Sequence, residues 1–167
     1  MKTLIKTSAV ALVAAGIGIG SAFFGQTEQA SQAALAASGE PGSTFFRAFV
    51  NDKLVSSENG SNNGMNCNRD GLGAWERFEL DLVDGGVSIC GNNGKFVSSE
   101  NGNRSMRCNR NAVGAWEVFD IEDREGRRTV LKGNNGKYVS SEDARQPMRC
   151  NRNGVGSWEE FFSSIAP

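Results

Sequence analysis

The chain has 167 residues, 21 of them glycine, and its 18 basic and 19 acidic side chains nearly cancel to a formal net charge of −1. Charges of both signs are mixed along the sequence, so we expect no basic face for nucleic acid or an anionic membrane. Histidine is absent, which excludes histidine general bases, Ser–His–Asp and Cys–His catalytic arrangements, and most catalytic zinc sites.

The N-terminal segment has the pattern of an export signal. Lysines precede an apolar run from Ala9 to Phe24, and Ala34-Leu35-Ala36 fits the small-residue rule for cleavage. We therefore expect residues 1–36 to be a cleaved signal peptide, residues 37–43 to be a short tail, and the protein to be secreted and extracellular. An uncleaved anchor is the alternative, but the run is short and glycine-rich, so we expect no stable membrane insertion after cleavage.

One sequence pattern then occurs three times. The tryptophans Trp75, Trp116 and Trp158 mark the copies at intervals of 41 and 42 residues. The second and third copies are identical at 20 of the 29 positions that start at Gly91 and Gly133. A fixed period of this length indicates a repeat architecture. We place one domain at residues 44–167, with repeats at about 44–84, 85–126 and 127–167.

Each copy reads as four short strands. A strand such as Val87–Cys90 leads into an Asn-Gly turn, where both central residues must accept positive φ. Lys95–Ser99 forms the return strand, Met-x-Cys-Asn-Arg a third, and Trp-Glu-x-Phe opens a fourth, while no window shows helical periodicity. Four strands per copy predict an all-β fold, a β-trefoil in which a six-stranded barrel is closed at one end by three hairpins. Propeller blades are the alternative, but three blades would not close a ring.

The repeated motifs carry a family resemblance. Gly-Lys-Tyr/Phe-Val-Ser-Ser-Glu, then Cys-Asn-Arg, then Gly-Ala-Trp-Glu-x-Phe resembles the fascin-like β-trefoil family, of the single-domain, secreted bacterial type, from about Thr44 to Phe162. The resemblance implies the β-trefoil fold, which hosts many unrelated activities. The best-known members are cytosolic actin bundlers built from four trefoils, so actin bundling is not expected of this chain. Relatives in secreted bacterial polysaccharide-degrading enzymes resemble appended sugar-binding modules, and these fit better.

Three of the four cysteines follow the repeat. Cys67, Cys108 and Cys150 each lie two residues after a methionine, and a symmetric set of three cannot pair completely. We expect them to be small buried core residues. A disulfide that involves Cys90 and a three-thiolate metal site are the alternatives. No metal or other cofactor is expected.

Other residues that occur in all three copies are expected to maintain the fold, because an active site is normally a single asymmetric constellation. The arginines are interpreted as members of a recurring ion pair, or as groups that bind the backbone, together with the glutamates of the Trp-Glu motif; a site for a sugar carboxylate or sulfate is the alternative. These residues are Arg69, Arg110 and Arg152 with Glu76, Glu117 and Glu159.

The tryptophans are expected to turn inward and close one end of the barrel, because large aromatic side chains are usually at least partly buried. Three exposed tryptophans would instead form a platform for stacking sugars.

Binding groups are expected in the loops, where functional residues usually lie on a rigid scaffold. Amides can both donate to and accept from sugar hydroxyls, and an aromatic ring can stack on a sugar. The alternative is that the asparagines only form turns, but the first repeat has lost this turn at Val50–Asp52, which favours a binding role. The candidate residues are Asn92, Asn93, Lys95, Glu100, Asn134, Asn135, Lys137, Tyr138 and Glu142.

The sequence therefore predicts a secreted, non-catalytic, lectin-like module that binds extracellular polysaccharide or glycan as a monomer, through up to three shallow sites that add by effective concentration. An extracellular protein-interaction, matrix or inhibitor module is the alternative, and it would present a contiguous apolar patch on one face. A hydrolase would need two carboxylates facing each other across a cleft.

Overall fold

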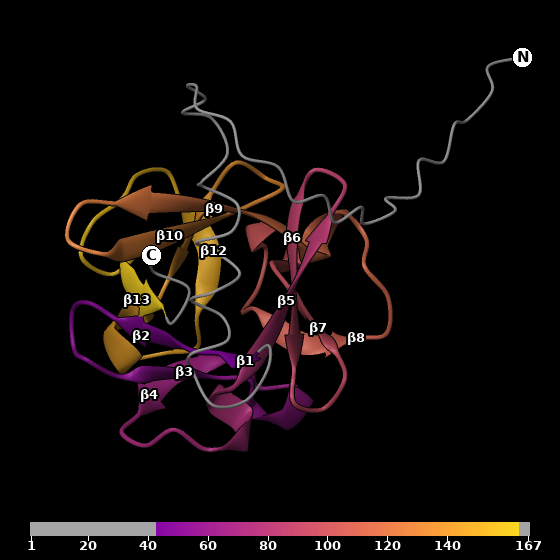
Figure 1. The fold of residues 1–167 in the computed structure, drawn as a ribbon, viewed down its shortest axis with the longest axis horizontal. Coiled ribbons are helices and arrows are strands. Elements are labelled where there is room, and N and C mark those ends of the chain that lie inside the picture. The colour runs from indigo at the N-terminus through magenta and orange to yellow at the C-terminus, as the bar shows by residue number, and fades with distance from the viewer. Residues whose placement is uncertain (1–42, 164–167) are drawn as a thin grey trace, which may run out of the picture.

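The computed structural model of the chain describes residues 43–163. Within this range it contains thirteen β-strands and five short 3-10 helices, and no α-helix (Figure 1). No helix in the described part of the chain is long and apolar enough to cross a membrane. The predicted signal peptide, and the tail up to residue 42, lie outside the described residues.

Each repeat supplies four strands, as predicted. The first repeat contains β2 (Phe46–Ala48), β3 (Leu54–Ser56), β4 (Asn66–Arg69) and β5 (Phe78–Val83). The second contains β6 (Gly86–Gly91), β7 (Phe96–Ser98), β8 (Arg107–Arg110) and β9 (Val118–Arg124). The third contains β10 (Arg128–Gly133), β11 (Tyr138–Ser140), β12 (Arg149–Arg152) and β13 (Phe161–Ser163), and a further two-residue strand, β1 (Ser43–Thr44), precedes β2.

Strand pairing closes the barrel. The hydrogen-bonded order is β1-β5-β6-β9-β10-β13-β2, and only Phe45 separates β1 from β2, so these two act as one bent strand that joins both ends of the path. The hairpins β3–β4, β7–β8 and β11–β12 extend from the barrel strands. A six-stranded barrel with three hairpins is the β-trefoil predicted from the repeats, and no propeller blade is formed.

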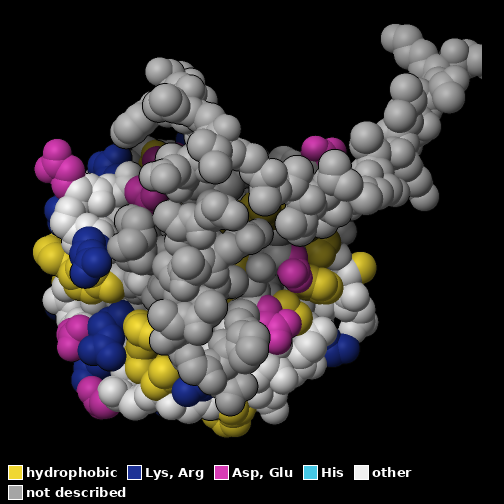
Figure 2. Space-filling view, viewed as in Figure 1, with side chains coloured by type: hydrophobic (Ala, Val, Ile, Leu, Met, Phe, Trp, Pro, Cys, Tyr) yellow, Lys and Arg dark blue, Asp and Glu magenta, His cyan; other side chains and the backbone are white. Residues whose placement is uncertain are grey.

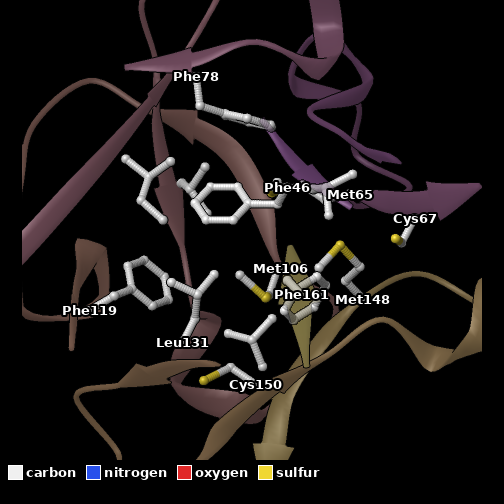
Figure 3. Close-up of a cluster of buried hydrophobic side chains, with 14 of the residues drawn as sticks. Phe46, Met65, Cys67, Phe78, Met106, Phe119, Leu131, Met148, Cys150 and Phe161 are labelled. Atoms are coloured by element: carbon white, nitrogen blue, oxygen red, sulfur yellow. The ribbon is translucent and has the colours of Figure 1, made fainter. Parts of the chain in front are cut away.

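The core consists of residue triplets related by the repeat (Figure 3). The largest members are Phe78, Phe119 and Phe161, which are at most 1% exposed. The prediction of small buried cysteines is confirmed, since Cys67, Cys108 and Cys150 are free thiols with no exposed surface. Burial raises the pKa of the Cys67 thiol to about 12, and those of Cys108 and Cys150 to about 11. The remaining triplets are Phe46, Ile89 and Leu131; Val55, Val97 and Val139; and Met65, Met106 and Met148.

The methionines also join the repeats through their backbones. The Met65 N–H donates to the Met106 carbonyl, Met106 to Met148, and Met148 back to Met65, each at 2.9 Å. This closed ring satisfies backbone groups that would otherwise be buried without partners. It makes the three hairpins mutually dependent.

Each tryptophan lies in a short turn, which is a 3-10 helix in the first two repeats, rather than in a strand. The turns are η2 (Ala74–Glu76), η4 (Ala115–Glu117) and a turn around Trp158, and the following strand starts one or two residues later. The tryptophan carbonyl accepts from the second serine of the Ser-Ser-Glu motif at 2.8 Å in all three repeats. The irregular backbone turns the indole away from the face that Phe78, Phe119 and Phe161 bury. Trp75 and Trp116 are 42% and 41% exposed, so the prediction that the tryptophans close the barrel is wrong for these two.

Candidate functional site

The repeated arginines form ion pairs with two glutamates each. The Nε of Arg69, Arg110 and Arg152 lies 3.8, 3.6 and 3.7 Å from the glutamate of the Trp-Glu motif, as predicted. That glutamate also accepts from the N–H of the preceding glycine, at 2.9 Å in the Gly73–Glu76 case. The predicted structural pairing is therefore present in each repeat.

The closer partner of each arginine is the glutamate of the Ser-Ser-Glu motif. Arg110 Nη2 lies 2.5 Å from Glu100, and Arg152 Nη2 lies 2.7 Å from Glu142. Glu100 and Glu142 are buried, and both have left-handed backbone conformations, with φ of 50° and 53°. This conformation brings their carboxylates inward, and it was not evident from sequence. The ion pairs occupy these two candidate binding residues, so a surface ligand does not reach them.

The asparagines of the Asn-Asn-Gly turns divide into two roles. Asn93 is half-buried; its Oδ1 accepts from the Lys95 N–H at 3.0 Å and its Nδ2 donates to the Cys108 carbonyl at 3.1 Å. Asn135 makes the equivalent pair of bonds. Asn92 and Asn134 are exposed, and among residues 43–163 the Oδ1 of each accepts from one serine hydroxyl, Ser57 at 3.3 Å for Asn92 and Ser99 at 3.2 Å for Asn134.

The first repeat retains this turn in a longer form. Asn51 Oδ1 accepts from the Lys53 N–H at 3.1 Å, as Asn93 does from Lys95. Asp52, with φ of 59°, takes the place of Gly94, with φ of 69°. The turn closes between Ala48 and Lys53, one residue more than between Gly91 and Lys95. The interpretation that the first repeat had lost the turn is wrong, because an aspartate accepts the left-handed conformation that glycine provides elsewhere.

The remaining candidates contact neighbouring side chains. The amines of Lys95 and Lys137 donate to Asn111 and Asn153. Tyr138 is half-buried, and the Lys132 amine lies 5.5 Å from the centre of its ring. The ring is therefore covered in part by a cation, and is less available to a sugar than the exposed Trp75 or Trp116.

A cleft that we name cleft A lies at the junction of the first and second repeats. It has a volume of about 410 Å³ and is lined by Ser43, Ala74, Arg77, Phe78, Glu79, Cys90, Gly91 and Asn92. Glu79 and Asn92 are exposed, and Arg77 Nη1 donates to the Ser43 hydroxyl at 3.4 Å. Glu79 lies opposite Cys90 on the paired strands β5 and β6. Cleft A is thus lined by one acidic side chain, one basic side chain, one hydroxyl and one amide.

A smaller cleft, cleft B, occupies the equivalent junction of the second and third repeats. It measures about 90 Å³, and Asp120 lies opposite Lys132 on β9 and β10 in the register that Glu79 and Cys90 have. Its lining residues are Gly85, Val118, Asp120, Lys132, Gly133 and Asn134. The acid and the amide of cleft A therefore recur, while the long Lys132 side chain replaces the small Cys90.

The third junction has different chemistry. Phe162 lies opposite Arg47 on β13 and β2, and its ring contacts Phe49 edge-on at a centroid distance of 5.9 Å. Arg128 stacks on Phe49 at 4.8 Å and pairs with Glu160 at 2.7 Å. A hollow of about 410 Å³ remains beside this pair, and it is lined only by charged residues: Asp123, Arg124, Glu125, Arg128 and Glu160.

Charges are distributed without a dominant sign. On the face shown in Figure 2, the described basic and acidic side chains are interspersed. The residues that the structure describes contain no group of three or more cysteine, aspartate or glutamate side chains placed to hold a metal ion.

Comparison with known proteins places the chain in a family and identifies similar folds. The model of the fascin domain family matches residues 50–163. A search of curated proteins finds no match. Among solved structures, the designed threefold-symmetric protein ThreeFoil is 19% identical with a TM-score of 0.61, over 72% of this chain and 96% of its own.

Two further similar structures are named for saccharides. SeviL bound to asialo-GM1 saccharide is 8% identical with a TM-score of 0.60, and 73% of this chain covers 95% of it. An exo-β-1,3-galactanase from Clostridium thermocellum is 13% identical with a TM-score of 0.62 over 75% of this chain. This chain spans only 30% of that enzyme. At these identities the likenesses show the fold alone.

Proposed function

The chain belongs to the fascin domain family, and from that premise we propose that it is a secreted, non-catalytic module that binds extracellular carbohydrate. The observation that carries the proposal is cleft A. Sugars present hydroxyls that donate and accept, and such groups are recognised by convergent polar side chains in a preformed cleft. Cleft A offers Glu79, Arg77, Ser43 and Asn92 within about 410 Å³.

The amide of Asn92 is suited to this role. Its Oδ1 is held by the Ser57 hydroxyl at 3.3 Å, which orients the side chain. Within the described part of the chain, its Nδ2 donates to no protein group, so it remains available to a ligand hydroxyl. The Asn92 amide is thus fixed in orientation and keeps a donor for a ligand. In Asn93, by contrast, the Oδ1 and the Nδ2 both bind backbone groups of the protein.

An aromatic surface lies beside the cleft in sequence. Ala74 lines cleft A, and the next residue is Trp75, whose indole is 42% exposed. Exposed indoles stack on the apolar faces of sugar rings, with a gain typical of aromatic burial. We include Trp75 in the proposed site as the stacking group.

The similar structures suggest which saccharides to test first, and the acidic groups of cleft A argue against catalysis. Similar folds occur in a structure with asialo-GM1 saccharide, in a GlcNAcα1-4Gal-releasing endo-β-galactosidase from Clostridium perfringens and in the exo-β-1,3-galactanase. Asialo-GM1 saccharide and β-1,3-galactan are therefore the first probes. The chain covers only about a third of those enzymes, which supports a binding module rather than a catalytic unit. Cleft A contains one carboxylate, whereas glycoside hydrolysis ordinarily uses two.

The test is retention of the purified protein on β-1,3-galactan and on immobilised asialo-GM1 saccharide, with free saccharide as the competitor. We expect competitor-reversible retention that Asn92→Ala and Glu79→Gln each weaken by about tenfold, the value of one hydrogen bond to a polar or charged group. Asn103→Ala is the matched control, because Asn103 is exposed and outside the clefts. Failure of a broad polysaccharide panel to retain the protein would refute carbohydrate binding and favour the protein-interaction alternative.

A further inference from the structure

The three repeat junctions are equivalent in backbone register but not in side chains. The register pairs Glu79 with Cys90, Asp120 with Lys132, and Phe162 with Arg47. A hollow is found at or beside each junction. The three junctions therefore differ in the polar side chains that they offer to a ligand.

Two junctions keep the polar pair that the proposed function uses. Cleft A has Glu79 with Asn92, and cleft B has Asp120 with Asn134. In both, the asparagine Oδ1 is held by a serine of the preceding repeat, Ser57 or Ser99. The Oδ1 atoms of the two amides are therefore held alike, and each asparagine lines the same cleft as an exposed acidic residue.

Each of these clefts also has one cation, but on different strands. Arg77 supplies it in cleft A and Lys132 supplies it in cleft B, where Val118 takes the place of Arg77. Lys132 extends beside Tyr138, with its amine 3.9 Å from Glu122. Lys132 lines cleft B where Cys90 lines cleft A, and cleft B is smaller, at about 90 Å³ against 410 Å³.

The third junction has lost both polar groups. Phe162 stands at the position of the acid, and the longer turn of the first repeat places Phe49 and Val50 where the other repeats have one exposed asparagine. The Phe49 ring is covered by Phe162 at 5.9 Å and by Arg128 at 4.8 Å. The hollow beside it contains five charged side chains and neither an amide nor a hydroxyl.

We propose that the protein is bivalent for saccharide, with a primary site in cleft A, a weaker site in cleft B that Lys132 restricts, and none at the third junction. This inference rests on the proposed function, and it narrows the prediction of up to three sites to two that differ in strength. Two sites on one rigid barrel gain from effective concentration when one polymer or one glycan-covered surface engages both. The ligand class is therefore a polysaccharide or a dense glycan array rather than a free monosaccharide.

The test is native mass spectrometry of the full purified protein, titrated with asialo-GM1 saccharide and with β-1,3-linked galacto-oligosaccharides too short to bridge two clefts. We expect two adducts that fill in sequence. Asn92→Ala should weaken the tighter adduct by about tenfold, and Asn134→Ala should weaken the other adduct by the same factor. Asn103→Ala, an exposed amide outside both clefts, should leave both.

A variant with a larger cleft B tests whether Lys132 restricts this site. Lys132→Ala should enlarge cleft B and strengthen the weaker adduct at least threefold without changing the tighter one. Circular dichroism of each variant separates loss of binding from loss of fold. A maximum of one or three adducts, or loss of both adducts on either single asparagine substitution in a folded protein, would overturn the bivalent assignment while leaving carbohydrate binding intact. Absence of any adduct with both probes, together with no retention on the polysaccharide panel, would overturn the proposed function itself.

Discussion

The buried carboxylate of Glu142 makes the stability of the third hairpin depend on a single arginine. Arg152 is 37% exposed, but its partner Glu142 is only 1% exposed, and the two meet at 2.7 Å. Glu142 also accepts from Gln146 Nε2 at 2.9 Å. Arg152→Met removes the charge and keeps most of the alkyl stem, so the substitution tests the ion pair rather than packing.

The expected cost follows from the burial of the acid. Removing one partner of a fully buried ion pair costs about 3–5 kcal/mol, and the half-exposed arginine lowers this to about 2–3 kcal/mol. Loss of the Arg152 guanidinium at 5.8 Å from the Trp158 ring adds about 0.5 kcal/mol. We expect Arg152→Met to lower the free energy of unfolding by about 3 kcal/mol.

The chain offers a matched control for this substitution. Arg47 is also 37% exposed and lies 3.1 Å from Asp52, but that acid is 74% exposed. Arg47→Met should therefore cost less than about 1 kcal/mol, as exposed pairs do. The difference between the two variants reports the burial of the carboxylates of Glu142 and Glu159, which both pair with Arg152, together with about 0.5 kcal/mol from its contact with Trp158.

Unfolding in urea should be followed by far-ultraviolet circular dichroism. Tryptophan fluorescence is less suitable, because Trp158 lies beside Arg152 and its emission would change with the substitution itself. Adding Glu142→Gln to Arg152→Met should restore about 1–2 kcal/mol, since the unpaired charge is removed. Equal costs for Arg152→Met and Arg47→Met would refute the reasoning, and would mean that Gln146 and backbone groups suffice to hold Glu142.

Four further predictions concern the turns and the thiols. Ala144 has φ of 60° where the first two repeats have glycine, so Ala144→Gly should stabilise the protein by about 1 kcal/mol in the same assay; an equal gain from Ala115→Gly, outside the left-handed region, would contradict this. Gly102→Ala should cost more than about 2 kcal/mol, because the added Cβ would lie 2.6 Å from the Cys150 carbonyl oxygen; an unchanged melting temperature would disprove the close contact. Iodoacetamide at pH 8 should modify Cys90 alone in the folded protein and all four cysteines after unfolding, as counted by mass spectrometry, because a pKa of about 11 for Cys108 leaves only about 0.1% thiolate. The same raised thiol pKa values predict that the free energy of unfolding is constant below about pH 8.5 and falls above it. The thiols of the unfolded chain ionise first, so the folded state loses stability until its own thiols titrate near pH 11–12. Urea midpoints that stay constant from pH 8 to pH 10.5 would exclude this linkage.

Much of the fold was predictable because each structural role occurs three times. The spacing of Met65 and Cys67, with its two copies, placed both side chains on one face of a strand, and the structure buries them. The arginine and the glutamate of the Trp-Glu motif also recur together, and they are paired in every repeat. In these cases a local pattern and the tertiary environment agree.

The errors have a common physical origin in irregular backbone. The inward prediction for Trp75 rested on the usual burial of large aromatic side chains, but a 3-10 turn precedes β5 and the indole is 42% exposed. The glutamate of the Ser-Ser-Glu motif was assigned to a loop surface, but its left-handed φ turns it toward arginine. A signal for the latter was present, because that glutamate is invariant among three copies whose following loops diverge.

The clefts were harder to predict because no single repeat contains one. Cleft A combines Ser43, which directly precedes the first repeat, and Arg77 of that repeat with Cys90 and Asn92 of the second. Cleft B likewise combines residues of the second and third repeats. A group that the barrel itself requires must occur at all three junctions, as the methionine ring and the arginine pairs do. The exposed asparagine and its facing acid occur at only two, and the third junction closes its backbone without them. The barrel therefore closes at its third junction without these residues, and the proposed saccharide sites account for their presence at the other two.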